Sequence, residues 1–125
     1  MVMEQDIVMY ILMRSDMDSL NPGKAMAQAA HAGSQMSKKY SGKELYKKWS
    51  SQTEFGYGTT IVLNGGSIEN IHKELKAIRG TDIFDMVLDP TYPILDGEVV
   101  HTLPVETCAY VLADRTKVVI DLDLY

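Results

Sequence analysis

Short runs of apolar residues alternate along this chain with segments in which apolar residues recur every three or four positions. Continuous apolar runs at residues 7–13 and 107–113 have the pattern of strands that are buried on both faces. The β-branched residues at 59–63 and the apolar residues at 83–88 predict two more strands. Residues 7–13 would form the first and central strand of a sheet.

Two helices are predicted between the first two strands. Asn21 followed by Pro22 is a favourable helix start, because Asn caps a helix and Pro suits its first position, and this helix should run to about Lys39. A shorter helix is predicted over residues 43–49. Residues 50–58 are polar and contain glycine, so they are predicted to form a loop.

The clearest amphipathic segment is residues 68–78, where isoleucine and leucine fall at helical spacing. Ser67 would cap this helix and Gly80 would end it, because glycine favours the left-handed conformation found after helix ends. The Asn-Gly-Gly sequence at 64–66 is predicted to be a turn between strand and helix.

A β-hairpin is predicted at residues 92–101, because the Asp-Gly pair at 96–97 supplies positive-φ turn residues between two apolar segments. The Asp-Pro pair at 89–90 would end the preceding strand. Alternating apolar and acidic residues at 118–125 suggest a last short strand.

The order of these elements predicts an α/β sandwich with a largely parallel sheet, in which ligand sites usually lie at the carboxyl ends of the strands. Residues 14–24 and 89–92 both follow carboxyl ends of predicted strands. If those strands are neighbours, the two loops share a cleft.

Composition predicts a single domain over residues 1–125, since 46% of the residues are hydrophobic and can bury a sizeable core. The lone Cys108 lies in an apolar run, which excludes a disulfide framework and favours a reducing cytoplasm. Residues 1–6 contain no basic cluster, and the apolar run at 7–13 is far shorter than the roughly 20 residues of a membrane span. Neither a signal peptide nor a membrane partner is therefore expected.

The net charge of −5 argues against a nucleic-acid partner, but this average hides a basic patch. Residues 38–48 contain five lysines and one glutamate, so their local charge is +4 and the rest of the chain carries −9. Binding depends on this local distribution rather than on the total.

Lys24, Gln28 and His31 fall within about 60° of one another around the first predicted helix and form one narrow polar stripe. Lys24 lies in the first turn, where the unpaired amides already make the surroundings positive. It either faces an anionic substrate or catalytic carboxylate, or extends into water as an ordinary exposed lysine. Gln28 and His31, taken singly, are also explained as hydrogen-bonded packing residues.

Asp89 stands at the end of an apolar strand, where it is either a general base or only a turn residue before proline. His72 and His101 have no partner at metal-ligand spacing, so no zinc site is predicted. Cys108 has no basic neighbour that would activate its thiol.

The residues on both sides of the first helix start resemble a known family. Tyr-Ile-Leu-Met-Arg-Ser-Asp at 10–16, then Gly-Lys at 23–24 and Ala-Gln-Ala-Ala-His-Ala at 27–32, are similar to the opening of the type 2 peptidyl-tRNA hydrolases. The strand that ends in Asp89 and the closing Leu-Asp-Leu-Tyr at 122–125 match the order of later family elements. The likeness thus covers nearly the whole chain.

The resemblance implies a compact three-layer α/β/α sandwich on a mixed, mostly parallel four-stranded sheet, often dimeric, here with an inserted β-hairpin. It implies hydrolysis of the ester between a peptide and the terminal ribose of tRNA, with neither metal nor other cofactor. Lys24 would stabilise the substrate or the developing oxyanion, and Asp89 would orient or activate the attacking water. Gln28 and His31 would contact the substrate.

The second half departs from the family pattern. After the aspartate the family usually has Ala-Gly-Arg-Thr, whose threonine belongs to the active site, whereas residues 90–93 here are Pro-Thr-Tyr-Pro. Tyr92 therefore takes the arginine position, and Pro93 takes the threonine position. Thr91 is one candidate to replace the lost hydroxyl, and Thr107 is the candidate for the other site threonine of the family.

The tRNA contact implied by the resemblance falls on the basic patch, where aromatic residues that stack on unpaired bases are interleaved with lysines. These residues are Lys38, Lys39, Lys47 and Lys48, with Tyr40, Tyr46 and Trp49. The alternative for the patch is an ordinary solvated helix face. The alternative for the whole chain is a module that binds tRNA or a protein on the same fold without catalysis.

Overall fold

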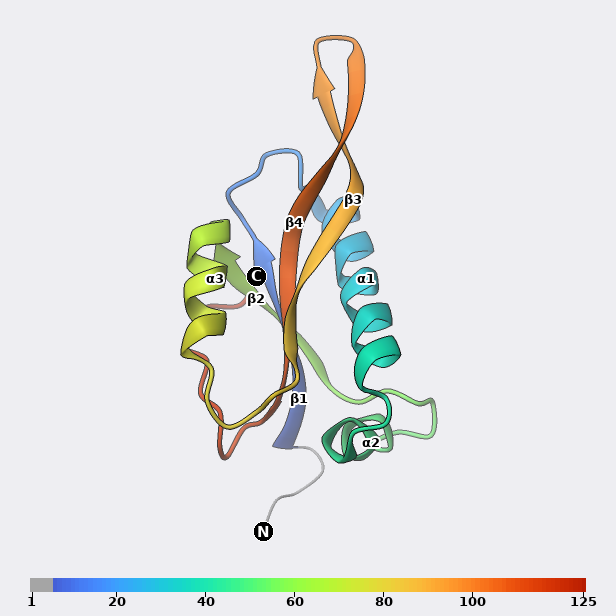
Figure 1. Ribbon diagram of the computed structural model, residues 1–125, viewed down its shortest axis with the longest axis vertical. Helices are drawn as coiled ribbons and strands as arrows, with labels where there is room; N and C mark the ends of the chain where they lie inside the picture. Colours follow the sequence, from blue (N-terminus) through green and yellow to red (C-terminus); the bar gives the residue numbers. More distant parts are fainter. Residues whose placement is uncertain (1–5) are drawn as a thin grey trace.

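A computed structural model describes residues 6–125 and has α/β architecture (Figure 1). Residues 1–5, part of the segment judged above to lack a signal peptide, lie outside the described residues. In chain order the elements are β1 (Ile7–Arg14), α1 (Pro22–Tyr40), α2 (Glu44–Ser50), β2 (Thr60–Gly66), α3 (Ile68–Ala77), β3 (Phe84–Asp96) and β4 (Val99–Asp114).

The four strands form one mixed sheet in the order β2-β1-β4-β3, so β1 is an inner strand as its apolar run predicts. The prediction of a mostly parallel sheet is wrong. Only β1 and β2 run parallel, whereas β4 is antiparallel to both β1 and β3. The cause is that a hairpin joins β3 to β4, and a tight hairpin can only connect antiparallel strands.

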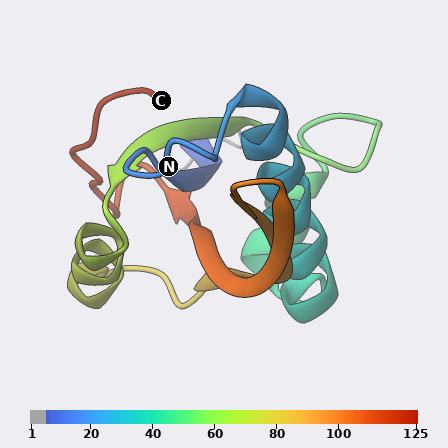
Figure 2. The same ribbon diagram turned by 90° about the horizontal axis from the view of Figure 1, so that it is seen from above.

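Helices cover both faces of the sheet, α1 and α2 on one face and α3 on the other (Figures 1 and 2). Ile7, Met9 and Ile11 point into a core shared with α1 and α2, and Leu12 points into a second core shared with α3. Burial on both faces explains why β1 is apolar without alternation. No helix among residues 6–125 is long and apolar enough to cross a membrane.

The first helix begins where the sequence predicts. The Asn21 side chain accepts a hydrogen bond from the Lys24 amide at 3.0 Å, and Pro22 occupies the first helical position. The turn predicted at 64–66 is wrong, because β2 continues through these residues. Gly65 is needed there for close packing instead, since a Cβ would lie 2.7 Å from the Ile71 side chain of α3.

Two strand predictions in the second half of the chain are also wrong. The Asp-Pro pair at 89–90 does not end β3, which continues to Asp96 by means of an irregularity in its pairing with β4. The tail at 118–125 is not a strand, and its pairing is a single bridge between Leu63 and Leu124.

The ends of β3 and β4 project beyond the helices and the other strands as a two-stranded arm, residues 93–104 (Figure 1). Asp96 pairs with Val99, so the turn at its tip is Gly97-Glu98 rather than the predicted Asp96-Gly97. Gly97 supplies the positive φ of 63°, as the first turn position of a type II′ hairpin requires.

Candidate active site

Three side chains from α1, β3 and β4 form one continuous hydrogen-bonded chain. The Thr107 hydroxyl donates to Gln28 Oε1 at 2.7 Å, and Gln28 Nε2 donates to Asp89 Oδ2 at 2.8 Å. Gln28 is only 3% exposed and Thr107 is fully buried, whereas Asp89 is partly accessible to solvent. Asp89 is therefore the member of this hydrogen-bonded chain that a ligand or a water molecule can reach.

Two irregularities in the pairing of β3 with β4 position the Thr107 and Asp89 side chains within this hydrogen-bonded chain. Val87 pairs with Cys108 and Leu88 pairs with Glu106, so Thr107 is an extra residue on β4. Such a bulge redirects a side chain, and this one meets Gln28. A second irregularity follows Asp89, where the Thr91 amide donates to Asp89 Oδ1 at 3.0 Å.

The surroundings of Asp89 favour its ionised form. Burial on its own would raise the pKa of this carboxyl, but the hydrogen bonds from Gln28 and the Thr91 amide, together with nearby His31, outweigh burial and lower the pKa below 3.8. At neutral pH Asp89 is therefore a carboxylate. The Gln28 amide donates to one carboxylate oxygen and the Thr91 amide donates to the other. Because a carboxylate has about four lone-pair sites, Asp89 can still accept a hydrogen bond from a further donor.

Lys24 lies one helical turn before Gln28, and its Nζ is 5.3 Å from the centre of the Tyr92 ring. Tyr92 is fully buried, and its hydroxyl is 3.0 Å from the Ser19 hydroxyl in the loop that leads to α1. The ring face attracts the ammonium group. Contact with the Tyr92 ring thus holds the Lys24 side chain one helical turn from Gln28. Because tyrosine is uncharged, the ring attracts the ammonium group without placing a second positive charge near it.

Contacts from the end of β1 and from α3 position β4, the strand that carries Thr107. Arg14 makes two contacts with Asp16, at 2.9 and 3.0 Å, and donates to the Glu106 carbonyl at 3.0 Å. His72 on α3 lies 3.0 Å from Glu106 Oε1. These contacts fix β4 directly before Thr107.

The remaining predicted site residues are divided between the site and the surface. His31 is exposed but close enough to Asp89 to affect its pKa. The Thr91 side chain is exposed, and hydrogen bonds from both its amide and its side chain lower the pKa of Asp89. Lys38, Lys39, Lys47 and Lys48 are exposed at the far end of α1 and on α2, and Lys39 forms an ion pair with Asp85.

The aromatic residues of the basic patch pack within the fold, and of the three only Trp49 is buried. Trp49 is 5% exposed and donates to the Thr59 carbonyl at 2.8 Å, Tyr46 packs on Trp49, and Tyr40 packs on Tyr110. One exposed pair of aromatic residues was not predicted from the sequence. Its members, which flank one glycine, are Phe55 and Tyr57, with ring centres 6.3 Å apart.

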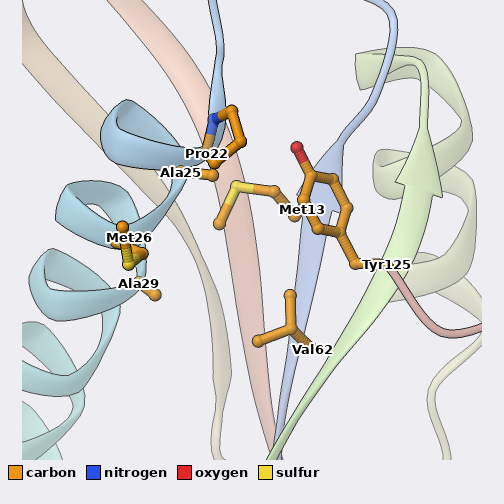
Figure 3. A pocket seen from close by; sticks show the side chains of 7 residues that line it. All are labelled: Met13, Pro22, Ala25, Met26, Ala29, Val62 and Tyr125. Atoms are coloured by element: carbon orange, nitrogen blue, oxygen red, sulfur yellow. The ribbon is translucent and has the colours of Figure 1, made fainter.

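A second feature lies on the other flank of α1. An apolar pocket of about 260 Å³ opens between α1 and β2, and in Figure 3 Tyr125 closes its side opposite Met26 and Ala29. Neither Gln28 nor Asp89 lines it. The pocket is therefore separate from the hydrogen-bonded chain.

Nothing in the described residues suggests metal or thiol chemistry. No group of three or more His, Cys, Asp or Glu residues within 6–125 could hold a metal ion. Cys108 is buried, and burial raises the pKa of its thiol to about 12, despite a contact with Thr107. A thiol with this pKa is not an activated nucleophile.

Replacing Gln28 with leucine should lower the free energy of unfolding at pH 7 by about 2–4 kcal/mol, because both Thr107 and Asp89 lose their partner. The lowered pKa of Asp89 means that its carboxylate stabilises the folded protein above pH 3.8 and that this stabilisation is lost as pH falls through the folded-state pKa. The difference between parent and Gln28→Leu should therefore shrink toward pH 3. Urea unfolding followed by circular dichroism measures both effects.

Gln35→Leu is the matched control, since Gln35 lies two turns further along α1 and donates to the Met86 carbonyl. Its effect should be smaller and independent of pH between 3 and 7. Equal, pH-independent losses in the two variants would contradict the coupling between Gln28 and the Asp89 carboxylate.

Comparison with known families decides what this chain is related to. A family model described as peptidyl-tRNA hydrolase PTH2 matches residues 7–85, well over half of the chain. The chain belongs to this family. No curated protein sequence matches it.

The PTH2 match includes Lys24 and Gln28 but ends at residue 85, before Asp89, the arm and Thr107. This limit agrees with the departures at residues 90–93 noted in the sequence. The family model thus covers the helix side of the site, with Lys24 and Gln28, and does not extend over Asp89 and Thr107 on the strand side.

Proposed function

We propose that this PTH2-family chain hydrolyses peptidyl-tRNA, releasing tRNA and a free peptide. The observation that carries the proposal is the chain from Thr107 through Gln28 to the accessible carboxylate of Asp89, with Lys24 one turn away. A carboxylate to direct water and an ammonium to stabilise negative charge are the two groups that ester hydrolysis needs.

In the proposed reaction Asp89 orients a water molecule toward the ester carbonyl and accepts its proton as the water oxygen bonds to carbon. The low pKa of this carboxylate makes it a weak base, so its larger contribution is positioning. The bond between the carbonyl carbon and the ribose oxygen then breaks, and the proton passes to that oxygen.

The proposed task of Lys24 is to stabilise the oxyanion that forms on the carbonyl oxygen. The ester carbonyl is neutral in the bound substrate and negative in the transition state, so an ammonium group there acts mainly on kcat. Contact with the Tyr92 ring limits the conformations of this long side chain before substrate binds.

Thr107 supports the proposal despite the proline at position 93. Its hydroxyl is fully buried and orients the Gln28 amide, so that the amide NH₂ group faces Asp89. A buried hydroxyl therefore belongs to this network although Pro93 has none, and the exposed Thr91 side chain adds a hydrogen bond to Asp89.

For the tRNA part of the substrate we assign the basic patch and the adjacent loop. Lys38, Lys47 and Lys48 are exposed, and the exposed pair Phe55 and Tyr57 follows α2 in the chain. Lysines bind phosphates, and exposed rings stack on unpaired bases.

Changing Lys38, Lys47 and Lys48 together to glutamine should weaken tRNA binding and flatten its salt dependence. The slope of log affinity against log salt should decrease by about 0.7–0.9 for each phosphate contact that is lost. Lys39 should contribute less, because Asp85 already neutralises it. Filter binding at 50–300 mM salt, about the range over which phosphate contacts are screened, measures the slope.

Lys73→Gln with Lys76→Gln is the control, because both lysines are exposed on α3, on the other face of the sheet. The same slope in the patch variant and the parent would remove the patch from the tRNA interface.

The competing function is tRNA or protein binding without catalysis, which the proline at the family's threonine position favours. A single-turnover assay with purified parent protein on N-acetylaminoacyl-tRNA separates the two. Release of free tRNA well above the rate without protein supports the hydrolase. Folded protein that shifts tRNA in a gel but releases none would favour the binding module.

A further inference from the structure

The arm differs in charge from the basic patch. Residues 93–104 contain Asp96 and Glu98 and no lysine or arginine, whereas residues 38–48 have a local charge of +4. A polyanion is repelled by the arm and attracted by the patch. The tRNA and the peptide leave the scissile ester in different directions, so the arm suits only the peptide.

The arm also begins at the candidate active site itself. Asp89 pairs with Val105 at its base, and Tyr92, which contacts Lys24, pairs with Leu103. The pairing of β1 with β4 ends at Met13 and Cys108. Beyond this point no described strand pairs with the outer edge of β4, so the backbone of the arm is open along that edge. An extended peptide can add to such an edge through main-chain hydrogen bonds.

One face of the arm continues the face that carries the site. Since side chains alternate along a strand, Val105, Leu103 and Val99, with His101 between the last two, share the face of Asp89 and Tyr92, which is directed toward α1. Leu103 is 47% exposed and Val99 is 57% exposed, although both are apolar. Exposed apolar residues that lead away from a site mark a binding surface.

We propose that this face of the arm, from Leu103 to Val99, binds the peptide part of peptidyl-tRNA as an extended segment. The proposal rests on the proposed hydrolase function and adds the position and length of the peptide subsite. The acidic arm and the basic patch divide the substrate between them, with the ester at Asp89.

The spacing of the arm sets which peptide residues it reaches. Counted from Val105, which pairs with Asp89, Leu103 lies about 7 Å away and Val99 about 20 Å away at roughly 3.3 Å per residue. An extended peptide covers these distances with about two and about six residues. Leu103 should therefore contact short peptides, and Val99 only longer ones.

The test compares one tRNA acylated with N-acetylalanine and the same tRNA acylated with an N-acetylated hexapeptide of alanine and valine. The double variant Leu103→Ser with Val99→Ser should lower kcat/KM for the hexapeptide substrate by about tenfold, while the single-residue substrate changes less than about twofold. With a tripeptide substrate, Leu103→Ser alone should have an effect and Val99→Ser alone should not.

The matched control is Leu95→Ser with Val100→Ser. These residues pair with each other on the opposite face of the same arm and are 68% and 61% exposed. This variant should cleave both substrates like the parent. Thermal unfolding should show that all variants are folded.

An equal loss for both substrates, no loss for either, or an equal effect of the control variant would overturn the peptide subsite and leave hydrolysis established. A parent protein that cleaves neither substrate would overturn the proposed function and, with it, the subsite.

Discussion

Asp89→Asn is expected to lower the single-turnover rate of peptidyl-tRNA hydrolysis by about a thousandfold, within the range that general bases contribute. The amide cannot accept a proton from water. The new amide also places either an NH₂ group or a carbonyl opposite Gln28 Nε2, which in the parent protein donates to Asp89 Oδ2 at 2.8 Å. If the amide groups face each other as donors, Gln28 must turn and lose its acceptor contact with the Thr107 hydroxyl.

The matched control is Asp85→Asn, four residues earlier on β3, whose carboxylate pairs with Lys39. Both variants remove one negative charge from the same strand, but only Asp89 belongs to the hydrogen-bonded chain. Asp85→Asn should therefore stay within a few-fold of the parent rate, as expected for an exposed ion pair. A folded Asp89→Asn protein with near-parent rate would exclude Asp89 from the proposed mechanism.

The helix side of the site is predictable because its signals are local. Asn21 and Pro22 define the start of α1 through capping and fixed φ, and helical spacing alone brings Lys24 and Gln28 to one side. The burial of Gln28 is not predictable in this way. It depends on the bulge at Thr107, and a bulge has no signature in a single strand's sequence.

The strand side shows where local signals fail. Proline after Asp89 is a reasonable strand end, yet β3 is the edge strand of the sheet, where an amide-free residue at an irregularity costs little. The largely parallel sheet fails for a related reason, since the sequence does not reveal that the predicted hairpin is the tip of one long β3–β4 hairpin.

The basic patch shows the limit for surface residues. The excess of lysine is visible in the sequence, but the pairing of Lys39 with Asp85, 46 positions away, is not. Similarly, Trp49 is an exposed candidate by composition and a buried residue by fold, because its indole donates to the Thr59 carbonyl. Long-range contacts thus decide which members of a patch remain available to a ligand.

Lys24→Met is expected to lower kcat by about a hundredfold or more, comparable to the loss of one oxyanion-stabilising group. Methionine keeps most of the length and the apolar contact with the Tyr92 ring but removes the ammonium. Since charge develops only in the transition state, KM for N-acetylaminoacyl-tRNA should change much less than kcat. Steady-state kinetics on the folded variant separate the two parameters.

Lys43→Met is the control for charge, because Lys43 is exposed at the start of α2 within the basic patch. It should weaken tRNA binding slightly and leave kcat unchanged, since a patch lysine contributes to association rather than to the reaction. If Lys24→Met instead raises KM with kcat intact, the ammonium binds phosphate in both ground and transition states. Lys24 would then belong with the tRNA contacts, and Asp89 with its water would be the remaining chemical centre of the proposed hydrolase.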